Sequence, residues 1–152
     1  MPKAMQSIEI EASAEAVFDL IHDYDRRLEW DPLLRKAVIL DGKSEAGKGV
    51  RTLCVGTWKS GGIGVETEYI SFARGRVAAV KLCNRPLFFD TFAATIQHKA
   101  LSKERSVVSY IYSFRARPRL LRWILEPIMN LFFYRETKKR LLALRRFMEQ
   151  SE

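Results

Sequence analysis

The chain is poor in the residues that cross-link proteins or bind metals. Its 152 residues include only two cysteines, Cys54 and Cys83, and two histidines. The cysteines form no close pair and fit no zinc-ligand spacing, so we predict neither a disulfide framework nor a metal site. Free cysteines are commonly buried, and they stay reduced in the cytosol. We therefore expect two mostly buried thiols and a cytoplasmic location.

Long apolar runs are also missing. The first residues contain none, so we expect no signal peptide. The most apolar segment covers residues 120–134, where Arg122, Glu126 and Asn130 interrupt it. It is shorter than the roughly 20 residues that a membrane-spanning helix needs. We therefore predict no transmembrane helix.

Familiar catalytic motifs are absent as well. The sequence has no G-x-S-x-G, no P-loop, no dinucleotide-binding glycine pattern and no zinc motif. The glycines near residues 61–64 fit a hairpin turn. We expect His22, at the end of the first helix, and His98, on a strand, to be structural. No residue is identified as catalytic, and we expect no cofactor.

Positive charge is what the sequence has in excess. With 26 basic and 18 acidic residues, the formal net charge is +8. Such a balance favours anionic partners, although a solvated basic surface explains it equally well. We expect no nucleic-acid binding, because no reader motif or aromatic platform is present. The sequence does not indicate an oligomeric state.

Hydrophobic periodicity first predicts a strand and a helical pair. Ile8 and Ile10 alternate with glutamates as on a half-buried strand, and Ser13 is placed as a helix N-cap. Pro32 ends any helical continuation. We expect Phe18, Ile21 and Trp30 to pack inward, and four charged residues to be solvated: Asp23, Asp25, Arg26 and Arg27.

Six strand-like segments and a long helix complete the chain. The strands are expected at residues 36–41, 50–58, 65–73, 77–84, 89–101 and 106–116, with Glu66 and Glu68 opposite Val65, Thr67 and Tyr69. Their hairpin spacing predicts an antiparallel sheet. Pro118 is suited to open a helix over residues 119 to about 148, and Pro127 to kink it or divide off a first segment.

These elements resemble a known family. The resemblance rests on "IEIEASAEAVFDLI" at the first strand and helix, "EWDPL" at Pro32, and the terminal "LEPIMNLFFYRETKKRLLALRRFME". Together with the run of strands, they are similar to the START-like (SRPBCC) superfamily, and within it to the polyketide cyclase/dehydrase and lipid-transport group. The resemblance covers nearly all of residues 1–152, which we expect to form a single START-like domain.

The resemblance implies an α+β helix-grip fold. In that fold a curved antiparallel β-sheet wraps around a long C-terminal α-helix, two short helices follow the first strand, and an apolar ligand occupies the cavity between sheet and helix. Its motifs mark the fold rather than a function.

Polar and aromatic residues on otherwise apolar faces are the candidates for the cavity wall. A carboxylate buried there has a raised pKa and can act as an acid; otherwise it lies at the rim or pairs with Arg115. Asp90 and Arg115 lie on the last strands. The residues expected to contact the ligand are Trp30, Trp58, Tyr69, Phe92, Tyr110, Tyr112, Met129, Phe132 and Glu136.

Two functions remain open. The first is binding or transport of a hydrophobic small molecule, such as a lipid, fatty acid, quinone or polyketide-like compound. The second is a cyclase or dehydratase acting on such a molecule. We favour binding, because the sequence does not show convergent acid–base groups.

An arginine cluster lies between the last strand and the helix: Arg115, Arg117, Arg119 and Arg122. Arginine holds carboxylates and phosphates bidentately, so we predict that the cluster contacts an acidic membrane surface near the cavity mouth. The alternative is a solubilising patch. Within residues 115–134 we expect most apolar side chains to face the sheet. Docking on a membrane would then use the four arginines together with Trp123.

Overall fold

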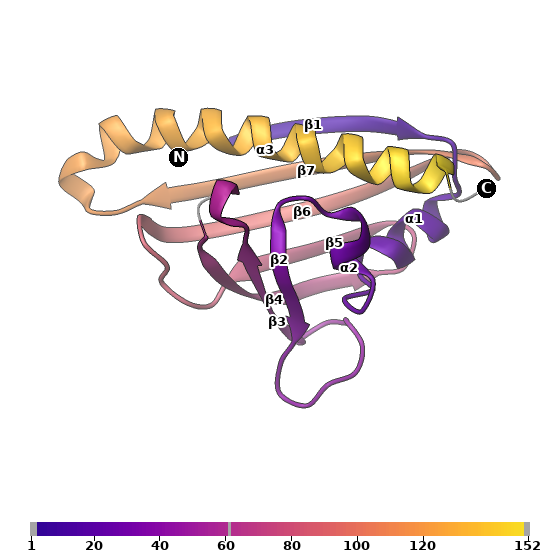
Figure 1. The fold of residues 1–152 in the computed structure, drawn as a ribbon, viewed down its shortest axis with the longest axis horizontal. Coiled ribbons are helices and arrows are strands. Elements are labelled where there is room, and N and C mark those ends of the chain that lie inside the picture. The colour runs from indigo at the N-terminus through magenta and orange to yellow at the C-terminus, as the bar shows by residue number, and fades with distance from the viewer. Residues whose placement is uncertain (1–2, 61, 151–152) are drawn as a thin grey trace.

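The computed structural model describes residues 3–60 and 62–150, which form one seven-stranded antiparallel sheet and a long helix (Figure 1). The strand order is β1-β7-β6-β5-β4-β3-β2. The strands are β1 (Lys3–Ile10), β2 (Leu34–Ile39), β3 (Arg51–Gly56), β4 (Gly64–Ala73), β5 (Val77–Leu82), β6 (Phe89–Ser102) and β7 (Arg105–Ala116). The helices are α1 (Ala14–Ile21), α2 (Arg27–Trp30) and α3 (Arg122–Gln150), with short 3-10 turns η1 (Trp58–Ser60) and η2 (Arg119–Leu121).

The helical pair between β1 and β2 forms for the local reasons that the sequence predicts. Ser13 Oγ accepts a hydrogen bond from the backbone N–H of Ala16 at 3.1 Å, which caps α1. Phe18 and Ile21 are buried beneath it. Asp31, before Pro32, has an extended backbone (φ −89°, ψ 106°), so α2 ends there. The predicted start and stop are both confirmed.

The sheet is built mainly from strands that follow one another in sequence. Each strand from β2 to β6 pairs antiparallel with the next one along the chain, and β7 also pairs antiparallel with β1, the first strand. Register shifts interrupt the ladders between Leu34 and Lys36, between Tyr69 and Ser71, and at both ends of β6. Such irregularities bend strands and increase twist, which suits a sheet that curves around a helix.

Helix α3 lies along β1 and β7 and covers the sheet (Figure 1). Leu141 and Leu144 of its C-terminal half pack in a core with Ile10, Val17 and Val108. The predicted helix-grip arrangement is therefore confirmed. The helix runs without a break through Pro127, which excludes the alternative that this proline divides off a first segment.

Two further expectations need correction. Cys54 and Cys83 are both free, but Cys83, directly after the end of β5, is exposed rather than buried. In the first half of α3, Ile124, Ile128 and Leu131 are 41%, 62% and 57% exposed, so fewer apolar side chains are covered by the sheet than expected. Trp123 is exposed, as its predicted place among the docking residues requires. Within the described residues, no helix is both long and apolar enough to cross a membrane.

Candidate ligand-binding cavity

A cavity of about 450 Å³ lies between the sheet and the helices. Its walls come from β3 to β7, from the segment that leads into α2, and from the stretch of α3 between Ile128 and Arg140. Most of the lining is apolar. Small-molecule sites are typically of this size, about 300–1,000 Å³, and have mostly apolar walls with a few polar groups.

Seven of the nine residues predicted to contact a ligand lie in this wall. Strand alternation explains the position of Tyr69, because Val65, Thr67 and Tyr69 share the concave face as predicted. The lining residues from the prediction are Tyr69, Phe92, Tyr110, Tyr112, Met129, Phe132 and Glu136.

Trp30 and Trp58 do not line the cavity. Trp30 is buried in the core that joins α1, β1 and α3, where Arg27 lies over its ring at 5.1 Å. Trp58 is 82% exposed in η1, and Arg35 lies over its ring at 5.1 Å. The sequence pattern placed Trp58 on a strand, but β3 ends at Gly56 and the alternation no longer applies.

Aromatic rings form one end of the cavity. Phe133 of α3 contacts Phe92 and Tyr112 of the sheet, with ring centroids 6.2 and 6.1 Å apart. The Tyr112 hydroxyl is buried and has no hydrogen-bond partner among the described residues. Burial also raises the pKa of Tyr112, so the hydroxyl is protonated and able to donate. An unpaired buried donor costs free energy unless a ligand or water accepts from it.

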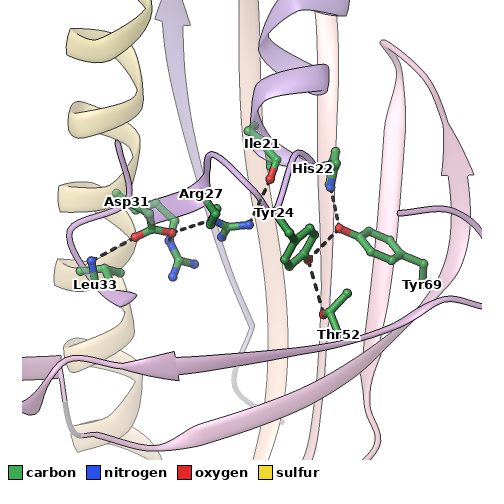
Figure 2. Close-up of polar contacts among 9 residues, drawn as sticks. Ile21, His22, Tyr24, Arg27, Asp31, Leu33, Thr52 and Tyr69 are labelled. Carbon is green, nitrogen blue, oxygen red and sulfur yellow. Dashed lines mark hydrogen bonds and ion pairs between the residues drawn. The ribbon is translucent and has the colours of Figure 1, made fainter. Parts of the chain in front are cut away.

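A row of hydrogen-bonded side chains forms a polar part of the wall (Figure 2). The Tyr69 hydroxyl lies 2.7 Å from His22 Nδ1 and 2.9 Å from the Tyr24 hydroxyl. The Tyr24 hydroxyl in turn donates to Thr52 Oγ1 at 3.4 Å, and Thr52 Oγ1 is 3.1 Å from Thr67 Oγ1. The row thus connects the end of α1 with β3 and β4.

The members of this row are neutral at ordinary pH. Burial raises the pKa of Tyr24 and raises that of Tyr69 well above its usual value. Burial, followed by the charges of Arg27 and His98, holds the pKa of His22 well below its usual value. Opposite shifts in an acid and its neighbouring base separate their pKa values, so proton transfer from Tyr69 to His22 is unfavourable. The hydrogen bonds of the row therefore fix the positions of its own tyrosine hydroxyl groups rather than move a proton between them.

An ion-pair cluster stands beside the row. Arg27 Nε donates to Asp31 Oδ2 at 2.9 Å, and Arg27 Nη1 donates to the Ile21 carbonyl at 3.1 Å. Arg140 Nε of α3 approaches the same Oδ2 at 3.0 Å. The Arg140 contact does not have hydrogen-bond geometry, and its buried Nε–H has no hydrogen-bond acceptor among the described residues. Both arginines line the cavity.

The carboxylate of Asp31 holds this cluster together. Burial alone would raise the pKa of Asp31, but the charges of Arg140 and Arg27 and hydrogen bonds from Arg27 and the Leu33 N–H lower it overall. Asp31 is therefore ionised at neutral pH. The prediction that Arg27 is solvated is wrong, because this side chain is buried between Tyr24, Trp30 and Asp31. In the sequence, the four-residue spacing between Arg27 and Asp31 was the feature that could have indicated this ion pair.

Glu136 lies on the helix side of the cavity. Its side chain is mostly buried, and Lys139 Nζ approaches its Oε1 at 3.4 Å. Arg115, which the sequence offered as a partner for a pocket carboxylate, instead pairs with Glu126 at 3.5 Å.

The arginine cluster is mostly engaged inside the protein. Arg122 lies 3.6 Å from Glu126 and 3.5 Å from Asp90, and Arg115 also pairs with Glu126. Arg117 donates to the carbonyls of Arg85 and Pro86 at 2.7 and 3.3 Å. Arg119 is exposed. Three of the four guanidinium groups therefore have partners within the protein, and contact of the cluster with an acidic membrane surface stays a prediction.

Comparisons with known proteins agree with this architecture. The family model described as "Polyketide cyclase / dehydrase and lipid transport" matches residues 1–149. No curated protein sequence matches the chain.

Several solved structures share the fold. A START superfamily protein from Mycobacterium smegmatis superposes with a TM-score of 0.82 at 13% identity, covering 99% of each chain. The Zhui aromatase/cyclase from Streptomyces sp. R1128 gives 0.80 at 16% identity, covering 98% of this chain and 94% of its own. Norcoclaurine synthase from Thalictrum flavum gives 0.71 at 12%, covering 99% and 88%. At such identities the likeness establishes the fold alone.

Proposed function

The chain belongs to the polyketide cyclase/dehydrase and lipid transport family, and we propose that it binds a hydrophobic small molecule that carries one oxygen-rich end. The observation that carries this proposal is the distribution of polarity in the cavity. Rings and aliphatic side chains make up most of the wall, while hydrogen-bonding groups gather around Arg140 and Tyr69. A purely hydrocarbon ligand would give the Tyr112 hydroxyl no acceptor and would leave the Arg140 Nε–H with only its poorly aligned contact to Asp31.

The unpaired donors indicate what the ligand offers. The Tyr112 hydroxyl is buried without an acceptor, the Arg140 Nε–H has an ion-pair contact with Asp31 but no well-aligned hydrogen bond, and both residues line the cavity. The Arg140 Nε–H would be satisfied by a carbonyl, carboxylate or phenolate oxygen of the ligand, and the Tyr112 hydroxyl, beside the Phe92 and Phe133 rings, by a further oxygen or by water. An amphiphile fits this pattern, with its oxygen at Arg140 and its apolar part against the Phe92 and Phe133 rings. Lipids, fatty acids, quinones and polyketide-like compounds all meet this description.

Binding is favoured over acid–base chemistry by the protonation states. An efficient general acid or base has a pKa near the working pH. The pKa values of Tyr24 and Tyr69 are instead raised, and that of His22 is lowered. These shifts stabilise the neutral forms, which suits a receptor for a ligand that is bound and released unchanged.

The test is competitive binding with Nile red as the apolar probe and palmitate as the amphiphile. We expect Nile red fluorescence to rise on binding and palmitate to displace it. Arg140→Gln should weaken palmitate roughly tenfold, since a hydrogen bond to a charged group contributes about 1.5–3 kcal/mol. Arg146→Gln, on the exposed side of the same helix, is the matched control. The proposal fails if Nile red does not bind, or if both variants retain wild-type affinity for palmitate.

A second candidate function is cyclisation or dehydration of a polyketide-like ligand. The pair of tyrosine hydroxyls at 2.9 Å, one of them 2.7 Å from His22, favours it, because neutral hydroxyl donors can polarise a ligand carbonyl. In that reaction an enol carbon would attack the carbonyl carbon to form a C–C bond, while the enol O–H releases its proton and the carbonyl oxygen takes up a proton. The resulting hydroxyl would then leave as water together with a hydrogen from the adjacent carbon, which forms a C=C double bond.

This candidate has its own test. A short poly-β-ketone analogue should be converted to a ring product by wild type, and Tyr69→Phe should slow the conversion at least tenfold while Tyr134→Phe, on an exposed part of α3, leaves it unchanged. Conversion no faster than in buffer would exclude the enzyme and leave the binding proposal intact.

A further inference from the structure

One face of the molecule exposes an unusual number of large apolar side chains. We define the mouth face as Leu87, Leu120, Trp123, Ile124, Ile128 and Leu131, which are between 41% and 87% exposed. Five of them come from η2 and α3, where three- and four-residue intervals place them on one side of the helix. The opposite side of the helix, with Met129 and Phe133, packs against the sheet. This stretch of α3 is therefore apolar on both sides.

The mouth face is continuous with the cavity. Leu87 and Ile128 line the cavity and are also 64% and 62% exposed, so the cavity opens among these side chains. Figure 1 places the β5–β6 connection and the start of α3 at the same end of the molecule. Arg117 joins them: its backbone N–H donates to the Phe88 carbonyl at 2.9 Å, and its guanidinium donates to the Arg85 carbonyl at 2.7 Å.

The backbone at this opening is held in an uncommon conformation. Phe88 has φ 70°, a region that residues with a side chain rarely occupy. Its ring lines the cavity and is 41% exposed. Strained positions of this kind tend to persist at functional sites. The backbone hydrogen bond from Arg117 ties Phe88 to the segment that precedes η2.

Charge next to the mouth face is positive. Arg119 adjoins Leu120, Arg135 follows one turn after Leu131, and both are exposed. From Arg115 to Arg135 the sequence has a single acidic residue, Glu126, which is buried and paired with Arg115 and Arg122. An apolar face with basic flanks complements the apolar core and the anionic head groups of a bilayer.

We propose that the mouth face docks on the surface of an anionic phospholipid bilayer, so that the cavity opens toward the lipid. Trp123 and the leucines would lie at the level of the head groups and upper acyl chains, and Arg119 and Arg135 would contact phosphate. Ligand would then pass between bilayer and cavity without crossing water. Docking goes beyond ligand binding and can be measured separately from it.

Vesicle co-sedimentation tests the apolar part of the surface. Wild type should bind phosphatidylcholine vesicles that contain phosphatidylglycerol. A triple variant, Leu120→Gln with Trp123→Gln and Leu131→Gln, should bind roughly tenfold more weakly or worse, because it removes apolar area from the docked face. The control triple is Met5→Gln with Ile70→Gln and Leu101→Gln, all exposed on strands. Equal binding by the two triples would overturn the proposal.

Two charge variants test the basic flank. Arg119→Gln with Arg135→Gln should weaken binding to the anionic vesicles roughly 30-fold, at about 1 kcal/mol for each basic residue near the surface. Lys99→Gln with Lys103→Gln removes the same charge from β6 and its turn and should have little effect. Added salt should weaken wild-type binding. If both pairs lose affinity equally, net charge rather than this surface drives binding, and the proposal is wrong.

The emission of Trp123 separates a bilayer from a second copy of the chain. The protein has three tryptophans; Trp30 is buried, so in a Trp58→Phe background Trp123 is the exposed one. We expect its emission to shift to the blue when anionic vesicles are added, while ligand binding measured with Nile red continues without vesicles. Two results together would assign the face to self-association and refute docking. The emission would be shifted to the blue before any lipid is added, and the protein would be a dimer that becomes a monomer in the variant with Leu120→Gln, Trp123→Gln and Leu131→Gln.

Discussion

The acid sensitivity of the fold provides a quantitative prediction, centred on His98. This side chain lies on β6 and its ring packs against Phe18, with centroids 5.3 Å apart. Neither ring nitrogen has a hydrogen-bond partner within the described residues. Burial lowers the pKa of His98 from 6.5 to about 4. The folded state therefore resists protonation of a group that the unfolded chain protonates readily.

The sign and size of the effect follow from linkage. Between pH 6.5 and about 4 the unfolded state binds one more proton at this position, so the free energy of unfolding falls as the pH falls. At about 1.4 kcal/mol per pKa unit, the full loss is about 3 kcal/mol. About 2 kcal/mol of it is expected between about pH 7 and about pH 4.5. The lowered pKa of His22 acts in the same direction.

Urea unfolding of wild type and His98→Leu at these two pH values measures the effect. Relative to wild type, the variant should gain about 2 kcal/mol of stability on going from about pH 7 to about pH 4.5. The control is Ile96→Val, which changes a buried side chain on the same strand but no titrating group. It should change the free energy of unfolding by the same amount at both pH values. With only two histidines in the chain, an NMR titration of the variant reports His22 alone. A stability difference that stays constant with pH would refute the argument.

Three other substitutions test what holds the site together. Asp31→Ala leaves Arg27 buried without its carboxylate, so thermal unfolding should show a loss of about 3 kcal/mol or more; a loss under 1 kcal/mol would mean that water reaches the cluster. Glu126→Ala removes the acceptor for the Ala116 N–H at 2.9 Å and the partner of Arg115, and should lower the melting temperature well below that of the exposed control Glu149→Ala. Ser13→Ala should cost about 1 kcal/mol through the lost cap of α1, and no change in urea unfolding would count against the cap.

Local patterns predicted most of the fold because local chemistry decides it. The Ser13 cap, the stop at Pro32 and the alternation of Val65, Thr67 and Tyr69 depend on neighbouring residues, and the structure has all three. Hairpin spacing was sufficient to predict the antiparallel sheet. The alternation also put Tyr69 on the cavity side.

The polar cluster was missed because distant residues create it. Arg27 and Asp31 have the spacing of an ordinary surface ion pair on a helix. In the folded protein they are buried, and α3, from the far end of the chain, brings Arg140 against the same carboxylate. No pattern in the sequence indicates the contact between Arg140 and Asp31.

The burial of the first half of α3 was overestimated for a related reason. Its first half has apolar residues on all sides, so periodicity does not distinguish the side with Met129 from the side with Leu131. The sheet decides which side is covered. The exposed side that results is the basis of the docking proposal.

The central claim, that the cavity holds an amphipathic ligand, is tested most directly by what accompanies the purified protein. Wild type and Ala94→Trp, which places a large ring in the cavity wall, should be extracted with organic solvent and their extracts compared by mass spectrometry. We predict that wild type yields a stoichiometric apolar compound with at least one oxygen and that the variant, folded by circular dichroism, yields much less. The same compound at equal occupancy in both proteins, or none in wild type together with no binding of Nile red, would contradict the account.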